Sequence, residues 1–249
     1  MNAKSFITFK IFSNYPELIC AFSTRMGGLS TGKLSSLNLG FNTTDSPNLV
    51  QSNRHLFYKA LQISKDHIAF QDQTHSPNVK YVLRPGMYSN TDALICKTRG
   101  IFLAIQTADC FPVFLYSAAI KLVAIIHVGW RGAISGIIDN TLQVIKTDHT
   151  NNLADFLVTI GPGLNAECFE VKEEVYSQFP EKFLRKHNDK QKRYLNLKDY
   201  IIYKLLQFGI LSSNIYIYPD CTKCNGSHFY SYRRDGQHSG RMMGIIGMK

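Results

Sequence analysis

Residues 106–132, QTADCFPVFLYSAAIKLVAIIHVGWRG, combine two apolar runs with side chains that can bind a metal ion. Cys110 precedes the first run, His127 lies near the end of the second, and a Gly-Trp-Arg-Gly sequence follows shortly after. Thiolates and imidazoles are common protein ligands of zinc and copper ions. A metal site requires that the fold bring Cys110 and His127 together.

The two apolar runs predict an antiparallel hairpin of strands 111–116 and 121–128 around a loop of residues 117–120. In this register residue 116 lies opposite residue 121, and Cys110 lies opposite His127. Directly opposed residues have Cβ atoms about 4.5 to 5.5 Å apart, so both side chains can reach one metal ion. A register shift of one residue would remove this arrangement.

A cysteine and a histidine supply half of a tetrahedral site, and His75 is the best candidate for a third ligand. It lies next to Pro77 in the segment FQDQTHSPNVKYV, where a loop is expected between two strand-like runs. The remaining histidines fall in a helix, in polar connections or in basic segments: His55, His67, His149, His187, His228 and His238. Two imidazoles and one thiolate leave one position open, as in catalytic zinc sites.

Copper is the alternative ion, because blue-copper sites also use two histidines and one cysteine. A multicopper oxidase needs in addition a trinuclear cluster with many histidines in His-x-His pairs. The chain has 8 histidines and no His-x-His pair. The histidine content therefore favours zinc over a laccase centre.

Two segments combine arginine with glycine, as anion-binding loops do. In residues 23–42 the backbone of Gly27 and Gly28 can approach an anion while Arg25 and Ser30 donate hydrogen bonds, although a plain turn has the same composition. Arg131 follows His127 at the expected start of a helix, where the helix dipole adds positive potential. Trp130 beside it is suited to stacking on a base or to core packing.

The C-terminal segment YSYRRDGQHSGRM, residues 230–242, is rich in arginine and glycine. By itself it indicates either a solvated basic turn or a loop that supports an anionic site. The nearby CTKC sequence, residues 221–224, has the spacing of half a metal site or of a redox pair. A second pair at suitable spacing is missing from the sequence, so we interpret Cys224 as incidental.

The surrounding pattern alternates strands with helices and predicts an α+β fold with a mixed sheet. Apolar residues at helical spacing predict helices at 48–63, 133–147 and 197–209. Short β-branched or aromatic runs predict strands within 101–110, 111–116, 121–128, 155–163 and 214–222.

Composition limits the class of protein. The chain has 249 residues, 45% of them hydrophobic and 18% charged, which predicts one folded domain over residues 1–249. The sequence contains no membrane-length apolar run and no signal-peptide core at its start, so we expect a soluble, cytoplasmic protein with reduced cysteines.

The net charge of +10 fits an anionic small substrate, a nucleic-acid binder or a generally lysine-rich surface. Basic residues concentrate at 181–194 and 232–241, and the first of these segments is expected to be a solvated connection without interleaved stacking aromatics. A non-enzymatic nucleic-acid binder therefore remains an alternative, but specific nucleic-acid binding is not expected.

Seven short motifs resemble, in order and across nearly the entire chain, those of the laccase-domain family, also called the polyphenol oxidase, YfiH-like or peptidoglycan editing factor family. They are TRMGGLS (24–30), QTH (73–75), ADCFPV (108–113), HVGWRG (127–132), GPG (161–163), CFEV (168–171) and SYRRDGQHSGR (231–241). Ala133, Asn165 and Cys168 depart from the family pattern, which bears on substrate preference rather than on reaction class.

The resemblance implies a single compact domain of packed mixed β-sheets with flanking helices, similar to the fold of a bacterial deamidating toxin. It implies a zinc-dependent purine nucleoside phosphorylase, acting on adenosine, inosine, guanosine or methylthioadenosine, that also deaminates adenosine. The implied zinc ligands are His75, Cys110 and His127. Cys110, His127 and Asp109 are the candidate catalytic residues, and the candidates for binding substrate or phosphate are Arg25, Gly28, Ser30, Asn42, Arg131, Arg233 and Arg241.

Two further activities stay open at this point. The first is zinc-dependent hydrolysis, either deamination or cleavage of an amide in peptidoglycan precursors, with Asp92 or Asp109 moving protons. The second is copper-dependent oxidation of polyphenols. Small-molecule substrates and no membrane partner are expected, and the oligomeric state is left open.

Overall fold

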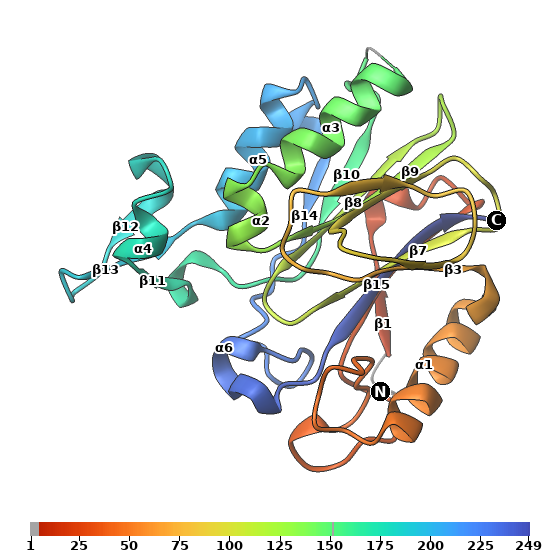
Figure 1. Ribbon diagram of the computed structural model, residues 1–249, viewed down its shortest axis with the longest axis horizontal. Coiled ribbons are helices and arrows are strands. Elements are labelled where there is room, and N and C mark those ends of the chain that lie inside the picture. The colour runs from red at the N-terminus through yellow and green to blue at the C-terminus, as the bar shows by residue number, and fades with distance from the viewer. Residues whose placement is uncertain (1–4, 151) are drawn as a thin grey trace.

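A computed structural model describes residues 5–150 and 152–249 of the chain. Two sheets of six strands face each other, and helices cover the outer face of each sheet (Figure 1). The predicted α+β fold with mixed sheets and flanking helices is confirmed. No helix among the described residues has the length and apolar character needed to cross a membrane.

The first sheet has the strand order β1-β2-β15-β7-β3-β5. Strand β7 pairs antiparallel with β15 and parallel with β3, so the sheet is mixed. The strands are β1 (Phe6–Thr8), β2 (Leu18–Ser23), β3 (Ile68–Gln71), β5 (Gly86–Tyr88), β7 (Phe102–Thr107) and β15 (Met242–Met248).

Helix α1 (Pro47–Leu61) covers the outer face of this first sheet. It begins with proline in its first turn, where the missing N–H removes no helical hydrogen bond, and it ends at Gln62 in the left-handed conformation. Phe57 and Leu61 bury their side chains against strands β2, β7 and β15. The helix predicted at 48–63 is thus present and ends two residues earlier.

The second sheet has the strand order β14-β10-β8-β9-β6-β4. Its central strands are buried on both faces, as their continuous apolar sequences require. Phe114 and Tyr116 point into the core between the sheets, whereas Val113 and Leu115 point toward the outer helices. The strands are β4 (Val79–Tyr81), β6 (Ala93–Cys96), β8 (Phe111–Ser117), β9 (Leu122–Val128), β10 (Leu157–Ile160) and β14 (Ile215–Ile217).

Three helices cover the outer face of the second sheet: α2 (Trp130–Ile134), α3 (Ile137–Asp148) and α5 (Leu197–Gln207) (Figure 1). The single helix predicted at 133–147 is wrong, because Gly136 adopts a left-handed φ of 88° and separates α2 from α3. The helix predicted at 197–209 is present as α5 and ends two residues earlier.

A small third sheet, in the order β11-β13-β12, projects from the body of the protein together with α4 (Glu173–Tyr176) (Figure 1). Its strands are β11 (Glu170–Lys172), β12 (Leu184–Lys186) and β13 (Lys192–Leu195). The basic segment 181–194 is therefore not only a connection, because it forms most of a hairpin. The short helix α6 (Tyr232–Asp235) follows near the C-terminus.

Candidate metal centre and its cavity

His75, Cys110 and His127 meet at one end of the second sheet. His75 lies in the loop between β3 and β4, Cys110 directly precedes β8, and His127 belongs to β9. One ligand atom from each side chain lies within 4.8 Å of the other two. The Cys110 Sγ is 3.7 Å from the His75 Nε2, and the two imidazole centroids are 4.8 Å apart. The three predicted ligands thus form a group that can hold one metal ion.

The hairpin pairing that suggested this group is wrong by two residues. Phe111 pairs with Val128 and Ser117 with Leu122, so Pro112, and not Cys110, lies opposite His127. The turn consists of residues 118–121 instead of 117–120. Because side chains alternate between faces with a period of two, a shift of two residues keeps each side chain on its predicted face. Cys110 and His127 therefore still meet, although diagonally.

The buried carboxylate of Asp92 organises two of the three candidate ligands. Its Oδ1 lies 2.7 Å from the His127 Nδ1, which leaves the His127 Nε2 for a metal ion. The carboxylate also accepts backbone hydrogen bonds from Thr74, His75 and Ser76 at 3.1, 3.0 and 2.7 Å. These bonds hold the loop of His75, whose backbone has a left-handed φ of 60°.

The charges of the group favour an ionised thiol. Burial opposes ionisation of Cys110, but His127 and His75 outweigh burial and lower the pKa of the thiol to about 6. Burial also opposes protonation of His127, whereas the Cys110 thiolate and Asp92 raise its pKa to about 9. The Asp92 carboxyl is itself desolvated, yet its bonds to His127 and Ser76 lower its pKa to about 2. These shifts favour a Cys110 thiolate beside a protonated His127 in the metal-free protein.

The group fits a bound metal ion in shape as well as in donor chemistry. A Cβ atom on Gly129 would lie 2.7 Å from the His75 Cδ2 and 3.0 Å from the Cys110 Sγ. Only glycine therefore leaves His75 and Cys110 in this arrangement. Two imidazole nitrogens and one thiolate are the ligands of catalytic zinc and of blue-copper sites, so the donor set by itself does not identify the ion.

The three candidate ligands line a cavity of about 880 Å³. Its walls combine aromatic rings with positively charged groups, as a site for a base and an anion requires. The aromatic residues are Phe41, Phe70, Trp130, Phe169 and Tyr232, and the arginines are Arg54, Arg131, Arg233 and Arg241. Asn42, predicted to bind substrate, also lines the cavity.

The four arginines of the cavity differ in how much of each guanidinium is already bound. Arg131 is exposed and stacks on Trp130, with its Cζ 4.4 Å from the ring centroid. Arg233 and Arg241 donate to backbone carbonyls of Glu170 and Ser239, at 2.7 and 2.8 Å. Arg54, which sequence reasoning missed, donates to the Leu39 carbonyl. Arg131 has the guanidinium most available to an anion.

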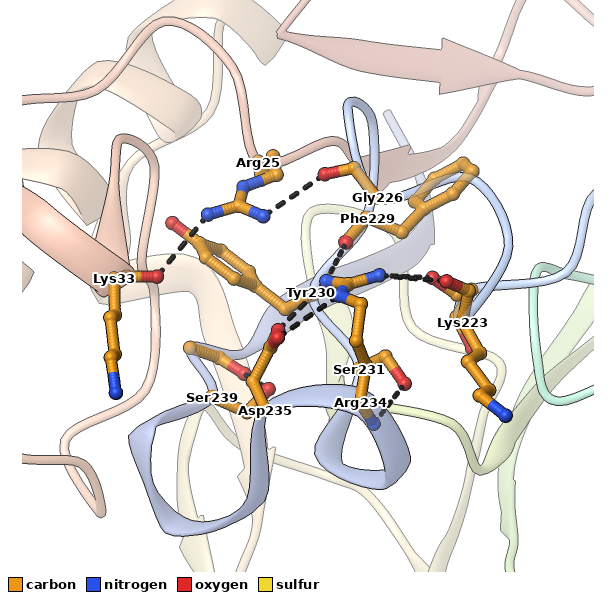
Figure 2. A network of polar contacts seen from close by, with 12 residues as sticks. Arg25, Lys33, Lys223, Gly226, Phe229, Tyr230, Ser231, Arg234, Asp235 and Ser239 are labelled. Atoms are coloured by element: carbon orange, nitrogen blue, oxygen red, sulfur yellow. Dashed lines mark hydrogen bonds and ion pairs between the residues drawn. The ribbon is translucent and has the colours of Figure 1, made fainter.

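Three residues predicted to bind substrate, Arg25, Gly28 and Ser30, are not among the cavity-lining residues. The Arg25 guanidinium donates to the backbone carbonyls of Ser35, Gly226 and Lys33, two of which Figure 2 shows. A Cβ on Gly28 would lie 2.3 Å from the Ser36 carbonyl oxygen, so the glycine permits tight packing of the backbone. The Ser30 hydroxyl donates to Asp45. This geometry gives all three residues a structural role.

Asp109, predicted to be catalytic, connects three segments at the edge of the cavity. Its Oδ1 accepts a hydrogen bond from the Thr222 hydroxyl, and its Oδ2 accepts one from the Arg233 backbone N–H, both at 2.6 Å. Its backbone has a left-handed φ of 90°. Both carboxylate oxygens are thus engaged, which favours positioning of Cys110 and Arg233 over proton transfer.

Two buried polar side chains in the cavity wall were also missed. The Gln71 Oε1 and the Thr107 Oγ1 have no hydrogen-bond partner within the described part of the chain, and both residues line the cavity. A buried polar atom without a partner is costly unless a ligand or water satisfies it. Each lies in or at the end of an apolar strand, so the sequence offered no signal that could have found them.

Comparison with known proteins identifies a matching family model and several relatives that align over most of the chain. A family model described as "Multi-copper polyphenol oxidoreductase laccase" matches residues 19–249. The chain is 30% identical over 262 residues to the Bacteroides thetaiotaomicron protein named purine nucleoside phosphorylase. The alignment covers 98% of this chain and 96% of the relative. It is 32% identical over 233 residues to the Escherichia coli purine nucleoside phosphorylase YfiH, with coverage of 90% and 91%.

The fold has a close counterpart among solved structures. The crystal structure of YlmD from Geobacillus stearothermophilus matches with a TM-score of 0.93 at 26% identity and covers 100% of this chain and 98% of that chain. The predicted family resemblance and the fold that it implied are therefore confirmed.

Proposed function

We propose a function for this chain, which belongs to the multi-copper polyphenol oxidoreductase laccase family. The proposed function is phosphorolysis of purine nucleosides. The observation that carries the proposal is the cavity in which the His75, Cys110 and His127 group lies beside aromatic rings and Arg131. Relatives at about 30% identity that bear the name purine nucleoside phosphorylase support this assignment. Inosine, adenosine, guanosine and methylthioadenosine are the candidate substrates.

In this reaction a phosphate oxygen attacks C1′ of the ribose, and the bond from C1′ to the purine nitrogen breaks. Its electron pair leaves with the base, which takes up a proton, and the products are the free base and ribose 1-phosphate. The sugar carries positive charge in the transition state, as in glycoside hydrolysis. A phosphate anion held next to C1′ therefore supplies both the nucleophile and a favourable charge.

The residues of the cavity divide between the two substrates. Arg131 is suited to phosphate, because its guanidinium is exposed and donates several hydrogen bonds in one plane. Phe41, Phe70 and Trp130 supply apolar wall for the base, although Arg54 lies over the two phenyl rings and Arg131 over one face of Trp130. Gln71 and Thr107 also line the cavity, although their unpartnered oxygens are buried within its wall.

We assign His75, Cys110 and His127 as the ligands of a zinc ion, with Asp92 holding His127 in the tautomer that exposes Nε2. A zinc ion held by these three residues would supply Lewis-acid chemistry and would activate water. The absence of His-x-His pairs from the sequence supports zinc over copper oxidase chemistry.

The same ligand set supports deamination of adenosine as a second activity, because replacement of the amino group at C6 by water requires an activated water molecule. Hydrolysis of an amide in peptidoglycan precursors would use the same chemistry and is the alternative. The net charge of +10 fits anionic small substrates in the cytoplasm, and we do not propose specific nucleic-acid binding.

The test is the release of hypoxanthine from inosine by the purified protein at increasing phosphate concentration, together with metal analysis of the same sample. We expect base release to require phosphate and to yield ribose 1-phosphate in equal amount. Release that is independent of phosphate, together with ammonia from adenosine, would replace phosphorolysis with hydrolysis. Oxygen consumption with a phenolic substrate and bound copper would support the oxidase instead.

A further inference from the structure

A second group of cysteines lies outside the cavity, in segments that are distant in sequence. Cys168 ends the short 3₁₀ turn between β10 and β11, and Cys221 and Cys224 belong to the turn that follows β14. The three sulfur atoms lie within 4.8 Å of one another, and the Sγ atoms of Cys168 and Cys224 are 3.3 Å apart. Cys224, interpreted from the sequence as incidental, is therefore part of a cluster.

The backbone around Cys221 is arranged to stabilise a thiolate. The Asn165 N–H donates a hydrogen bond to the Cys221 Sγ, with the nitrogen 3.4 Å from the sulfur. A backbone donor to the sulfur favours the thiolate form, which is the form that binds a metal ion.

The turn is also held rigidly before any ligand binds. Gly163 and Cys221 form an isolated β-bridge, and the Thr222 N–H donates to the Gly163 carbonyl at 3.0 Å. On the other side, the Arg234 guanidinium donates to the carbonyls of Thr222 and Lys223, both at 3.0 Å, as Figure 2 shows for Lys223. Because the turn is already ordered, the cysteines lose less conformational entropy when a ligand binds.

The separations of the sulfur atoms suit a shared ion better than a covalent pair. A disulfide has sulfur atoms about 2.05 Å apart, whereas two thiolates on one tetrahedral zinc ion, with Zn–S bonds of about 2.3 Å, are roughly 3.8 Å apart. The observed 3.3 Å between Cys168 and Cys224 lies closer to the second value.

We propose that Cys168, Cys221 and Cys224 form a second metal site, for a soft thiophilic ion of the Zn²⁺ class, with its fourth position open to solvent beside the exposed Cys224. Three thiolates are the donor set that selects such ions over hard cations. The ion ties the turn of Cys221 to the loop of Cys168.

This second site supports the cavity without contributing a group to it. Thr222, next to Cys221, donates to Asp109, and Phe169, next to Cys168, lines the cavity. A cation held by all three sulfurs would fix both segments.

The test uses the full chain, reduced and stripped of metal, in a background that lacks the first site. We expect the Cys110→Ser protein to bind one Zn²⁺ per chain, and the Cys110→Ser/Cys224→Ser protein to bind it at least 100-fold more weakly. Cys110→Ser/Cys96→Ala is the matched control, because Cys96 is a free cysteine outside both clusters, and it should bind like Cys110→Ser. Cobalt substitution should give a sulfur-to-metal charge-transfer band in the Cys110→Ser protein that Cys224→Ser removes.

Two outcomes would overturn the second site. One is a reduced, folded Cys110→Ser protein that binds no Zn²⁺. The other is binding that Cys224→Ser and Cys168→Ser leave unchanged, which would place the ion elsewhere. If the first outcome is found, a cross-linked peptide that joins Cys168 to Cys224 in protein purified without reductant would assign a disulfide to this pair. Each result is independent of the phosphorolysis assay.

Discussion

The His127 Nδ1 lies 2.7 Å from the Oδ1 of Asp92, and neither side chain is accessible to more than a trace of solvent. The same carboxylate accepts the backbone N–H of His75. One buried group therefore orients one candidate metal ligand and holds the loop of another, although it contributes no ligand itself.

Replacement of Asp92 by asparagine tests this positioning role. The amide keeps the shape of the carboxylate but loses the charge that favours His127 in its present tautomer, and outer-shell changes of this kind cost about 10- to 100-fold in metal affinity. We expect that loss in competition titrations with a chelator. The pKa of His127 should also fall, which a purely structural role would not cause. The exposed Asp148→Asn is the control, and unchanged affinity in Asp92→Asn would refute the assignment.

Loss of His75 should remove the first metal and the activity together. His75→Ala deletes one of three ligands, and two remaining ligands cannot hold zinc in competition with a chelator. The exposed His67→Ala controls for loss of a histidine and should retain both metal and phosphorolysis. Metal content is best measured in a Cys224→Ser background, so that only the first site is counted. A His75→Ala protein with a full metal equivalent in that background would contradict the ligand assignment.

Arg131 and Arg25 should separate phosphate binding from stability. Arg131→Ala removes a charged donor from the cavity, and hydrogen bonds to charged groups contribute about 1.5 to 3 kcal/mol, so kcat/KM for phosphate should fall roughly 10- to 100-fold. Arg25→Ala removes three bonds to backbone carbonyls outside the cavity. It should lower the free energy of unfolding by about 1 to 3 kcal/mol and leave the KM for phosphate unchanged. If instead Arg25→Ala weakens phosphate binding and Arg131→Ala does not, the phosphate site lies at the loop of Arg25.

Metal affinity at the first site should fall as the pH falls. His127, with a pKa raised to about 9, is protonated at neutral pH in the metal-free protein, whereas Cys110, with a pKa lowered to about 6, is ionised. Metal binding therefore displaces one proton between pH 6 and 9, and the dissociation constant should rise about tenfold for each unit of decreasing pH. Below about pH 6 the thiol also binds a proton and the dependence should steepen. A dissociation constant independent of pH from 9 to 6 would exclude His127 as a ligand.

Gly129→Ala should disturb the metal group while leaving the fold intact. Its Cβ would lie 2.7 Å from His75 and 3.0 Å from Cys110, and overpacking of this kind costs about 1 to 3 kcal/mol. Part of that cost should appear as weaker metal binding, because the clash can be relieved when His75 or Cys110 moves away from the other candidate ligands. Gly132→Ala is the matched control, since its Cβ would meet no atom closer than 3.4 Å. Equal metal affinity in the two variants would contradict this prediction, because it would show that the added Cβ is accommodated without displacing His75 or Cys110.

The sequence predicted the strands β7, β8, β9, β10 and β14 and the three candidate ligands, because these follow from local patterns, whereas the other strands of the structure were not predicted. The hairpin register could not be obtained in the same way, since the apolar runs do not show which four residues form the turn. The candidate pair survived because an error of two residues preserves the face on which Cys110 and His127 lie. A one-residue error would have separated them.

Contacts between distant segments account for what the sequence did not reveal. Asp92 was noted only as a candidate proton carrier, because its bonds to His127 and to residues 74–76 depend on the packing of β4, β6 and β9. Cys168 and Cys224 are 56 residues apart, and no pattern in either segment refers to the other. Arg25 was assigned to phosphate from loop composition together with the family resemblance, and neither distinguishes a loop that binds an anion from a loop whose arginine binds backbone carbonyls.

The position of β15 has a consequence for how the protein is synthesised. This strand, residues 242–248, pairs with both β2 and β7 and so lies inside the first sheet. During translation all the other strands of both sheets emerge from the ribosome before β15 does. Until residues 242–248 arrive, β2 and β7 face a gap with unpaired backbone groups, and open strand edges of this kind promote aggregation. A nascent chain therefore depends on rapid completion, or on a chaperone, and a premature stop just before β15 should yield an insoluble product.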